Sequence, residues 1–128
     1  MNGHDLQLAA VARAGSLPDA GLEQPFGPEW DVYKVRGRVF MLLTTLGEQP
    51  IVTLKATPED TKALCAGFEH IAPGYHMNKR HWITLSGGDD IDAALVHELV
   101  TESFLLVVEK LPRARRPIGL PERGGAAD

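Results

Sequence analysis

The spacing of apolar residues predicts three helices and four strands. Helices follow from apolar positions three or four residues apart, and strands from short runs of β-branched and aromatic residues. In chain order the expected elements are a helix at Asp5 to Ala14, strands at Trp30 to Val35, Val39 to Leu46 and Ile51 to Lys55, a helix at Pro58 to Glu69, a strand at His81 to Ser86 and a helix at Ile91 to Lys110. Short links between successive strands favour antiparallel pairing. We therefore expect an α+β fold, a single-domain sandwich in which helices pack on one face of an antiparallel sheet.

Capping and turn residues set the boundaries of these elements. Thr57 and Pro58, followed by two acids, are typical of a helix start, because threonine caps the helix and proline fits its first position. Asp89 or Asp90 is expected to cap the last helix. Residues 16–29 contain three prolines and are expected to form an extended connection over the surface.

The strand predicted at Val39 to Leu46 is apolar on both faces. Strict alternation divides its side chains into two sets, Val39, Met41 and Leu43 against Phe40, Leu42 and Leu46. Helices on one side of the sheet would leave one of these sets in water. We expect the connection at residues 16–29 to cover that second face, with a partner surface as the alternative.

Composition restricts the class of protein. A chain of 128 residues with 44% hydrophobic residues fits one compact domain, which we place at residues 1–112. The single cysteine, Cys65, cannot form an intramolecular disulfide. Residues 113–128 are rich in Arg, Pro and Gly and are expected to form a flexible basic tail. No apolar run is long enough to span a bilayer and no signal peptide is evident, so a cytoplasmic protein is expected.

The net charge of -4 counts against a surface that is basic throughout. The charges are unevenly distributed, however. Residues 84–109 contain six acids and no Lys or Arg, whereas residues 31–83 contain seven Lys and Arg against five acids. Much of the excess acid therefore belongs to the solvated face of the last helix, and a local basic surface elsewhere is compatible with the total.

Catalytic and metal-binding motifs are absent from the sequence. Cys65 falls on the predicted buried stripe of its helix, which favours an inert core thiol. The histidines at positions 70, 76 and 81 match no metal-ligand spacing. We therefore expect no enzyme, no cofactor and no metal, with an acid or base role for His76 or His81 as a remaining alternative.

The densest cluster of polar and aromatic residues lies at residues 75–82. It contains two imidazoles, two cations, an amide and two aromatic rings. Alternation along the strand directs Ile83 and Leu85 toward the helices and places Trp82 on the opposite, open face of the sheet. There an aromatic ring can stack on a nucleobase, and Lys79 and Arg80 can pair with phosphates. The alternative is that Trp82 packs in the core or under the loop and that both cations are only solvated.

A second basic feature lies at the turn between the first two strands. Lys34, Arg36 and Arg38 surround a glycine there, and Lys55 follows at the end of the third strand. A projecting hairpin of this kind can contact phosphates along a groove of nucleic acid. Charged residues at exposed hairpins also prevent edge-to-edge pairing, which is the alternative role.

The run from Pro73 to Trp82, PGYHMNKRHW, resembles the signature of the MmcQ/YjbR family. Weaker matches extend the resemblance over residues 4–116, including Leu17-Pro18 and the run from Val52 to Lys55. The sequence departs from the family pattern at Phe104, where a tyrosine is usual, and at Arg38, where a lysine is common. The resemblance implies a CyaY-like fold, similar to frataxin, and a DNA-binding protein with a double-wing motif.

We accordingly expect non-catalytic DNA binding with weak sequence specificity. The wings would be the basic hairpin and the loop that leads into the last strand. The expected contact residues are Lys34, Arg36, Arg38, Lys55, His76, Asn78, Lys79, Arg80 and Trp82. The alternative is binding of a small molecule or protein partner on the open sheet face around Trp82. We expect a monomer that does not bind membranes, with the open sheet face as the surface for any weak dimer.

Overall fold

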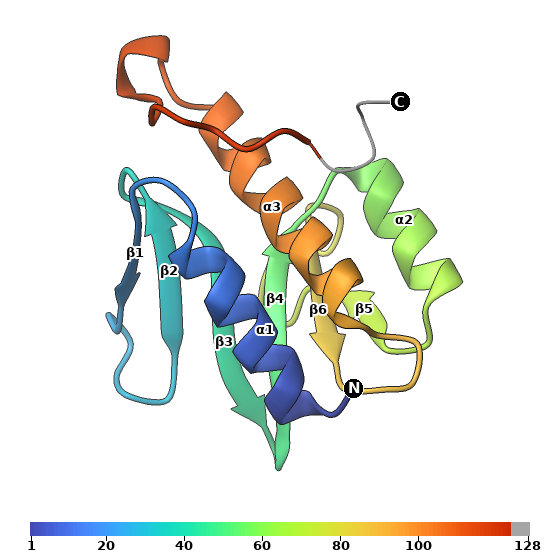
Figure 1. The fold of residues 1–128 in the computed structure, drawn as a ribbon. Coiled ribbons are helices and arrows are strands. Elements are labelled where there is room, and N and C mark those ends of the chain that lie inside the picture. The colour runs from blue at the N-terminus through green and yellow to red at the C-terminus, as the bar shows by residue number, and fades with distance from the viewer. Residues whose placement is uncertain (124–128) are drawn as a thin grey trace.

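The structure, a computed structural model, describes residues 1–123. The helices are α1 (Gly3–Gly15), α2 (Pro58–Gly67) and α3 (Ala93–Glu109), followed by a short 3-10 helix, η1 (Arg113–Arg115). The strands are β1 (Ala20–Glu23), β2 (Asp31–Val35), β3 (Arg38–Leu46), β4 (Gln49–Lys55), β5 (Ile71–Pro73) and β6 (Trp82–Ser86). All six strands belong to one antiparallel sheet with the order β1-β2-β3-β4-β6-β5 (Figure 1).

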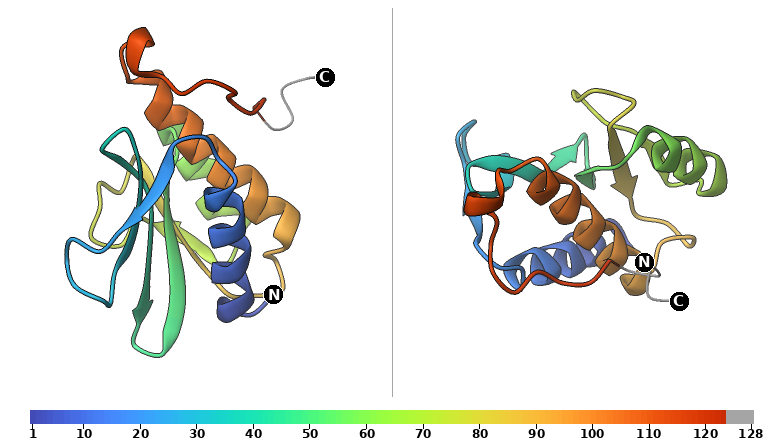
Figure 2. Two further views of the ribbon diagram at one scale, coloured as in Figure 1. Left: turned by 60° about the vertical axis from the view of Figure 1, so that its left-hand side comes forward. Right: turned by 90° about the horizontal axis from the view of Figure 1, so that it is seen from above.

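The predicted α+β class is confirmed, with helices on one face of the sheet. Helices α1 and α3 contact each other and lie across the central strands, while α2 contacts β5 and β6 (Figure 2). The main core lies between α1, α3 and the sheet, and Phe40 and Phe104 meet edge to face at its centre, with ring centroids 5.4 Å apart. The CyaY-like description remains an expectation of the family resemblance. Among residues 1–123, no helix is long and apolar enough to cross a membrane.

Strands β1 and β5 were not predicted from the sequence. The segment predicted as an irregular connection contains β1, which pairs with β2 from Ala20↔Val35 to Glu23↔Val32. Strand β5 pairs with β6 over three residues. Both are short edge strands, and their conformation depends on backbone pairing with a neighbour more than on their own side chains.

The cap predicted for the last helix was placed too early. The side chain of Asp92 accepts a hydrogen bond from the Leu95 N–H at 2.8 Å and caps α3. Asp90 instead holds His70, whose backbone N–H and ring Nδ1 lie 3.1 and 2.5 Å from its two carboxylate oxygens. The carboxylate of Asp90 therefore joins β5 to the segment after β6.

A β-bulge reverses part of the alternation predicted for β3. The pairing of β2 with β3 shifts between Tyr33↔Met41 and Lys34↔Val39, which leaves Phe40 as the extra residue. As a result Phe40 packs in the main core together with Met41, and Val39 lies on the other face. The predicted faces of Val39 and Phe40 were therefore wrong, although both faces of the strand are apolar as expected.

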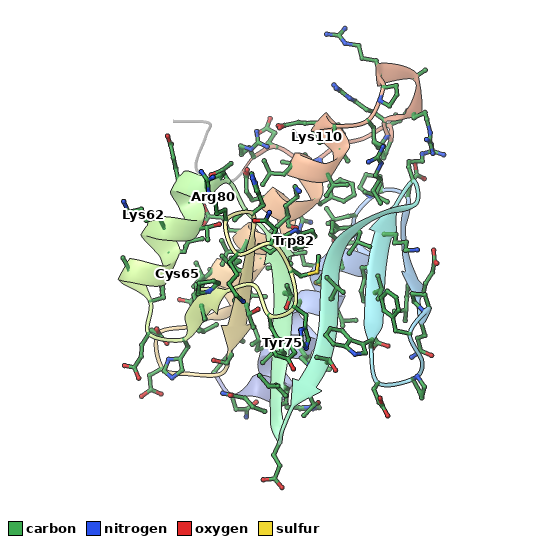
Figure 3. The ribbon with its side chains drawn as sticks, turned by 180° about the vertical axis from the view of Figure 1, so that it is seen from behind. Lys62, Cys65, Tyr75, Arg80, Trp82 and Lys110 are labelled. Carbon is green, nitrogen blue, oxygen red and sulfur yellow. The ribbon has the colours of Figure 1, made fainter. Side chains whose placement is uncertain are left out.

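The open face of the sheet carries a second, smaller apolar cluster. Its buried members are Val32, Leu42 and Trp82, and Trp30, Val39 and Met77 pack against them. None of residues 16–29, the predicted cover, belongs to this cluster, although Phe26 lies beside Leu42 in a pocket on the same face. Met77, in the loop between β5 and β6 that crosses this face of the sheet, packs against the cluster (Figure 3).

The segment after α3 returns along the helix. Arg116 donates hydrogen bonds to the backbone oxygens of Leu111 and Glu109, and Arg123 pairs with the carboxylates of Glu102 and Glu109 at 2.7 and 2.6 Å. The flexible tail predicted at residues 113–128 lies partly outside the described residues, because the structure describes nothing beyond residue 123.

The buried hydroxyl of Ser103 ties α3 to the sheet. Ser103 Oγ donates a hydrogen bond to the Phe40 carbonyl at 2.5 Å and accepts one from the Lys55 N–H at 2.8 Å. The last backbone pair between β3 and β4 is Met41↔Leu54, so Phe40 and Lys55 stand where the next pair would form. The serine hydroxyl therefore bridges Phe40 and Lys55 just beyond the end of the β3–β4 ladder.

We expect Ser103→Ala to lower the free energy of unfolding by about 2–3 kcal/mol, because it leaves a buried C=O and a partly buried N–H without their partner. Urea denaturation measures the change. Ser16→Ala is the matched control, since Ser16 is exposed and bonds only to Arg13, and a change within about 0.5 kcal/mol is expected there. Equal destabilisation by the two substitutions would contradict this role of Ser103.

Candidate nucleic-acid interface

The sheet brings both predicted wings to the same end of the molecule. Lys34 and Arg38 flank the β2–β3 turn, and Lys55, the last residue of β4, pairs with Trp82, the first residue of β6. The Ala56 N–H donates to the His81 carbonyl at 2.9 Å, which holds the end of the 74–81 loop against the end of β4. We call this region, where the β2–β3 turn, the end of β4 and the start of β6 meet, the cationic end.

Helix α3 adds further cations to the cationic end. Lys110 caps the C-terminus of α3, and Arg115 of η1 donates to the Arg36 carbonyl at 3.4 Å. Figure 3 shows Arg80, Trp82 and Lys110 at this same end. Sequence reasoning missed Lys110 because it is far from both wings along the chain, and only the packing of α3 on the sheet brings it near Lys55.

Two of the predicted contact residues are engaged by acids. Lys34 Nζ pairs with Glu23 at 3.1 Å and Arg36 Nη2 pairs with Asp19 at 3.1 Å. Both acids come from the β1 segment, so these ion pairs tie the edge strand to the hairpin. Arg38, by contrast, is exposed and has no ion pair among residues 1–123.

Lys55 is a partly buried cation with another cation nearby. Its Nζ lies 5.2 Å from the centroid of the Trp82 ring, a cation–π contact. Desolvation lowers the pKa of Lys55 from the ordinary value of 10.5, and repulsion by Lys110 lowers it further. Within the described part of the chain no carboxylate pairs with the Lys55 ammonium. A bound anion would relieve this repulsion.

Trp82 supports the interface from beneath. The residue is only 8% exposed and packs with Val32 and Leu42 on the open face, while Ile83 and Leu85 point into the main core as predicted. A ring buried in this way cannot stack on a nucleobase from solution. Trp82 instead packs under the loop, as in the alternative given above, and its ring makes the cation–π contact with Lys55.

The loop at residues 74–81 is held by its own polar side chains. Lys79 Nζ donates to the Gly74 carbonyl at 3.2 Å, and Asn78 Oδ1 accepts from the Arg80 N–H at 2.9 Å. A Cβ at Gly74 would lie 2.6 Å from the Cβ of Trp82, so only glycine permits this close approach. Asn78 and Lys79 thus maintain the loop, whereas His76 and Arg80 are exposed.

A groove runs between this loop and α2. Its volume is about 440 Å³. The lining residues include the cations Lys62, Lys79 and Arg80, the acid Glu59 and the thiol of Cys65. Burial raises the pKa of the Cys65 thiol, which keeps it in the neutral form and agrees with the predicted inert role. The groove extends the cationic surface from Lys55 toward α2.

A separate pocket of about 290 Å³ opens on the same face of the sheet. It is lined by Phe26, Trp30, Leu42, Thr53, Tyr75, His76 and Met77. Tyr75, His76 and Met77 belong to the predicted cluster at residues 75–82, whereas Phe26, Trp30 and Thr53 were not identified from the sequence. The aromatic residues Phe26 and Trp30 flank a turn-rich segment, and their presence there was the one signal in the sequence for this pocket.

Comparison with known proteins identifies the family of this chain. A family model described as YjbR matches residues 15–106, which is most of the chain. The chain belongs to the YjbR family. This confirms the resemblance to the MmcQ/YjbR family that the run from Pro73 to Trp82 suggested.

Relatives in this YjbR family match nearly the whole chain. The uncharacterized protein YbdF of Escherichia coli O157:H7 is 40% identical over 113 residues, which cover 88% of this chain and 93% of YbdF. The uncharacterized protein YjbR of Escherichia coli K12 is 28% identical over 100 residues, with coverage of 77% and 85%. The crystal structure of Deinococcus radiodurans protein DR2400, with a DUF419 domain, has a TM-score of 0.75 at 29% identity and covers 95% of this chain and 96% of that one.

Removing the charge of Lys110 should raise the pKa of Lys55. We expect Lys110→Gln to move the pKa toward 10.5 without reaching it, because desolvation is the larger cause of the shift and remains. An NMR titration of the Lys55 side chain measures this. Lys62→Gln removes an equal charge on α2 and serves as the control. If the two variants shift Lys55 equally, the specific repulsion by Lys110 is wrong.

Proposed function

We propose that this protein binds DNA without catalysing a reaction, through contacts between the cationic end and the phosphates. The observation that supports this most directly is the convergence of Lys55 and Lys110, two cations from distant parts of the chain that repel each other and share no acidic partner within residues 1–123. Such an arrangement raises the free energy of the unbound state. A phosphate placed between the two ammonium groups lowers it.

The distribution of acids is compatible with this function. Glu48 lies in the turn between β3 and β4, and Asp89 and Asp90 follow the end of β6. The antiparallel register puts these turns at the end of the sheet away from Lys55. Other acids do lie at the cationic end, where Glu23 and Asp19 pair with Lys34 and Arg36 and Glu59 lines the groove. The net charge of -4 weakens long-range attraction of DNA, so binding would depend on the cations there that have no ion pair within residues 1–123.

The predicted contact residues would take different parts in binding. Arg38, Lys55, Arg80 and Lys110 offer cations for direct phosphate contact. Lys34 and Arg36 are engaged in ion pairs and would contribute less. Contacts of this kind go to the backbone of DNA and carry little sequence information, which is why weak specificity is expected.

The pocket on the open sheet face supports a second candidate function, the binding of a small molecule without catalysis. Its lining is mainly aromatic and aliphatic, as is common for ligand sites. Binding of a neutral ligand there would depend little on salt. The two candidates are therefore separated by the salt dependence of binding.

The measurement is the affinity for a short DNA duplex as a function of salt. Each phosphate contact contributes about 0.9 to the slope of log affinity against log salt, so we expect the double variant Lys55→Gln, Lys110→Gln to lower the slope by about 1.8. Fluorescence anisotropy between about 50 and 200 mM salt covers the useful range.

A matched double variant controls for net charge. Lys34→Gln with Arg36→Gln also removes two positive charges, but from side chains that already have acidic partners. It should change the slope by less than half as much. Identical slopes for the wild type and the Lys55/Lys110 variant would refute phosphate binding at the cationic end.

A further inference from the structure

The pocket on the open sheet face has the size and lining of a site for a single flat ring. Its volume of about 290 Å³ lies at the lower limit for small-ligand sites. Phe26, Trp30, Tyr75 and His76 supply four aromatic rings around it. Tyr75 and His76 form a tilted pair with ring centroids 4.1 Å apart. Aromatic walls of this kind favour a planar heteroaromatic ligand, which gains stacking on either face.

The floor of the pocket offers hydrogen bonds as well. Thr53 Oγ1 lies 3.2 Å from Thr84 Oγ1, which in turn accepts the Tyr75 N–H at 2.9 Å. Each hydroxyl has one donor and two acceptor positions, so the pair is not saturated by these contacts. A ring that carries polar edge atoms can therefore bond to the floor while its faces contact the aromatic walls.

His76 adopts a left-handed backbone conformation, as Asp19 and Arg36 also do. Its φ is 58°, in the left-handed region that favours glycine. Its side chain is exposed at the rim of the pocket. This turn of the backbone presents the imidazole at the rim of the pocket.

The pocket and the cationic end share a common support. Met77 and Leu42 line the pocket and also pack with Trp82, and the Trp82 ring carries the Lys55 ammonium. The aromatic pocket and the Lys55 ammonium therefore lie on neighbouring parts of one apolar cluster. A ligand that has both a flat ring and a phosphate can use both.

We propose that this pocket binds one unpaired nucleobase of the nucleic acid whose phosphates contact the cationic end. The proposal rests on the proposed function and makes it more specific, because it names single-stranded nucleic acid, or a duplex with an unpaired base, as the preferred ligand. A base stacked inside a regular duplex cannot enter such a pocket unless it is flipped out. Stacking on aromatic side chains is tolerant of base identity.

The test compares three DNA ligands at one salt concentration. These are a single strand, a blunt duplex of the same length, and a strand of that length without bases. We expect the wild type to bind the intact strand about tenfold more tightly than either of the others, the effect of one stacked base. Anisotropy of labelled DNA gives the three affinities.

Two variants locate the effect in the pocket. Phe26→Ala removes a wall that is 67% exposed, and His76→Gly removes the imidazole while relieving the positive φ, so neither endangers the fold. Each should lower affinity for the single strand by about tenfold, and Phe26→Ala should leave duplex affinity and its salt slope unchanged. Leu22→Ala is the control, an exposed apolar residue on β1 that does not line the pocket.

The outcomes separate this proposal from the phosphate proposal. Equal affinity for strand and duplex, with the salt slope still dependent on Lys55 and Lys110, overturns the nucleobase pocket and leaves the phosphate site standing. Equal binding of the intact and the base-free strand overturns it also. No salt-dependent binding of any DNA overturns both proposals.

Discussion

The hydrogen bonds of the Ser103 hydroxyl hold together the part of the structure on which the cationic end depends. One hydroxyl joins α3 to the Phe40 carbonyl at the β3 bulge and to the Lys55 N–H at the end of β4. Without it, the buried Phe40 carbonyl and the partly buried Lys55 N–H would lose their partner. The bulge also turns Phe40 into the core, where it meets Phe104 on the same helix. Two neighbouring residues of α3 therefore make these contacts: Ser103 bonds to the backbone of Phe40 and Lys55, and Phe104 packs on the Phe40 ring.

The register of β4 with β6 and the position of α3 determine what surrounds the Lys55 side chain. Lys55 pairs with Trp82 across the sheet, so its side chain and the indole lie on the same face and its ammonium is carried on the ring. Helix α3, fixed by Ser103, ends at Lys110 close enough to lower the pKa of Lys55. Two cations are thus brought together by backbone register and helix packing rather than by attraction to any acid. Their repulsion adds to desolvation in lowering the pKa of Lys55.

Most of the fold could be predicted from the sequence because its elements have strong local signals. The Thr57 cap, the alternation in β6 and the long apolar face of α3 each act within a few residues. The failures all involve contacts between distant segments. The bulge at Phe40 depends on a serine more than sixty residues away, and β1 is a strand only because β2 pairs with it. The aspartates near α3 could not be assigned either, because Asp90 is engaged by His70 from the turn before β5.

The candidate site illustrates the same limit. The cluster at residues 75–82 was visible as a dense set of polar and aromatic side chains, yet the sequence could not separate those that build the loop from those that face outward. Gly74 must approach Trp82 closely, and Lys79 returns to the Gly74 carbonyl, so these residues close the loop over the indole. Once closed, the loop exposes His76 beside the pocket and Arg80 beside the groove. One short segment therefore supplies both an aromatic wall of the pocket, His76, and a cation of the groove, Arg80. The closed loop fixes where each of these two side chains lies.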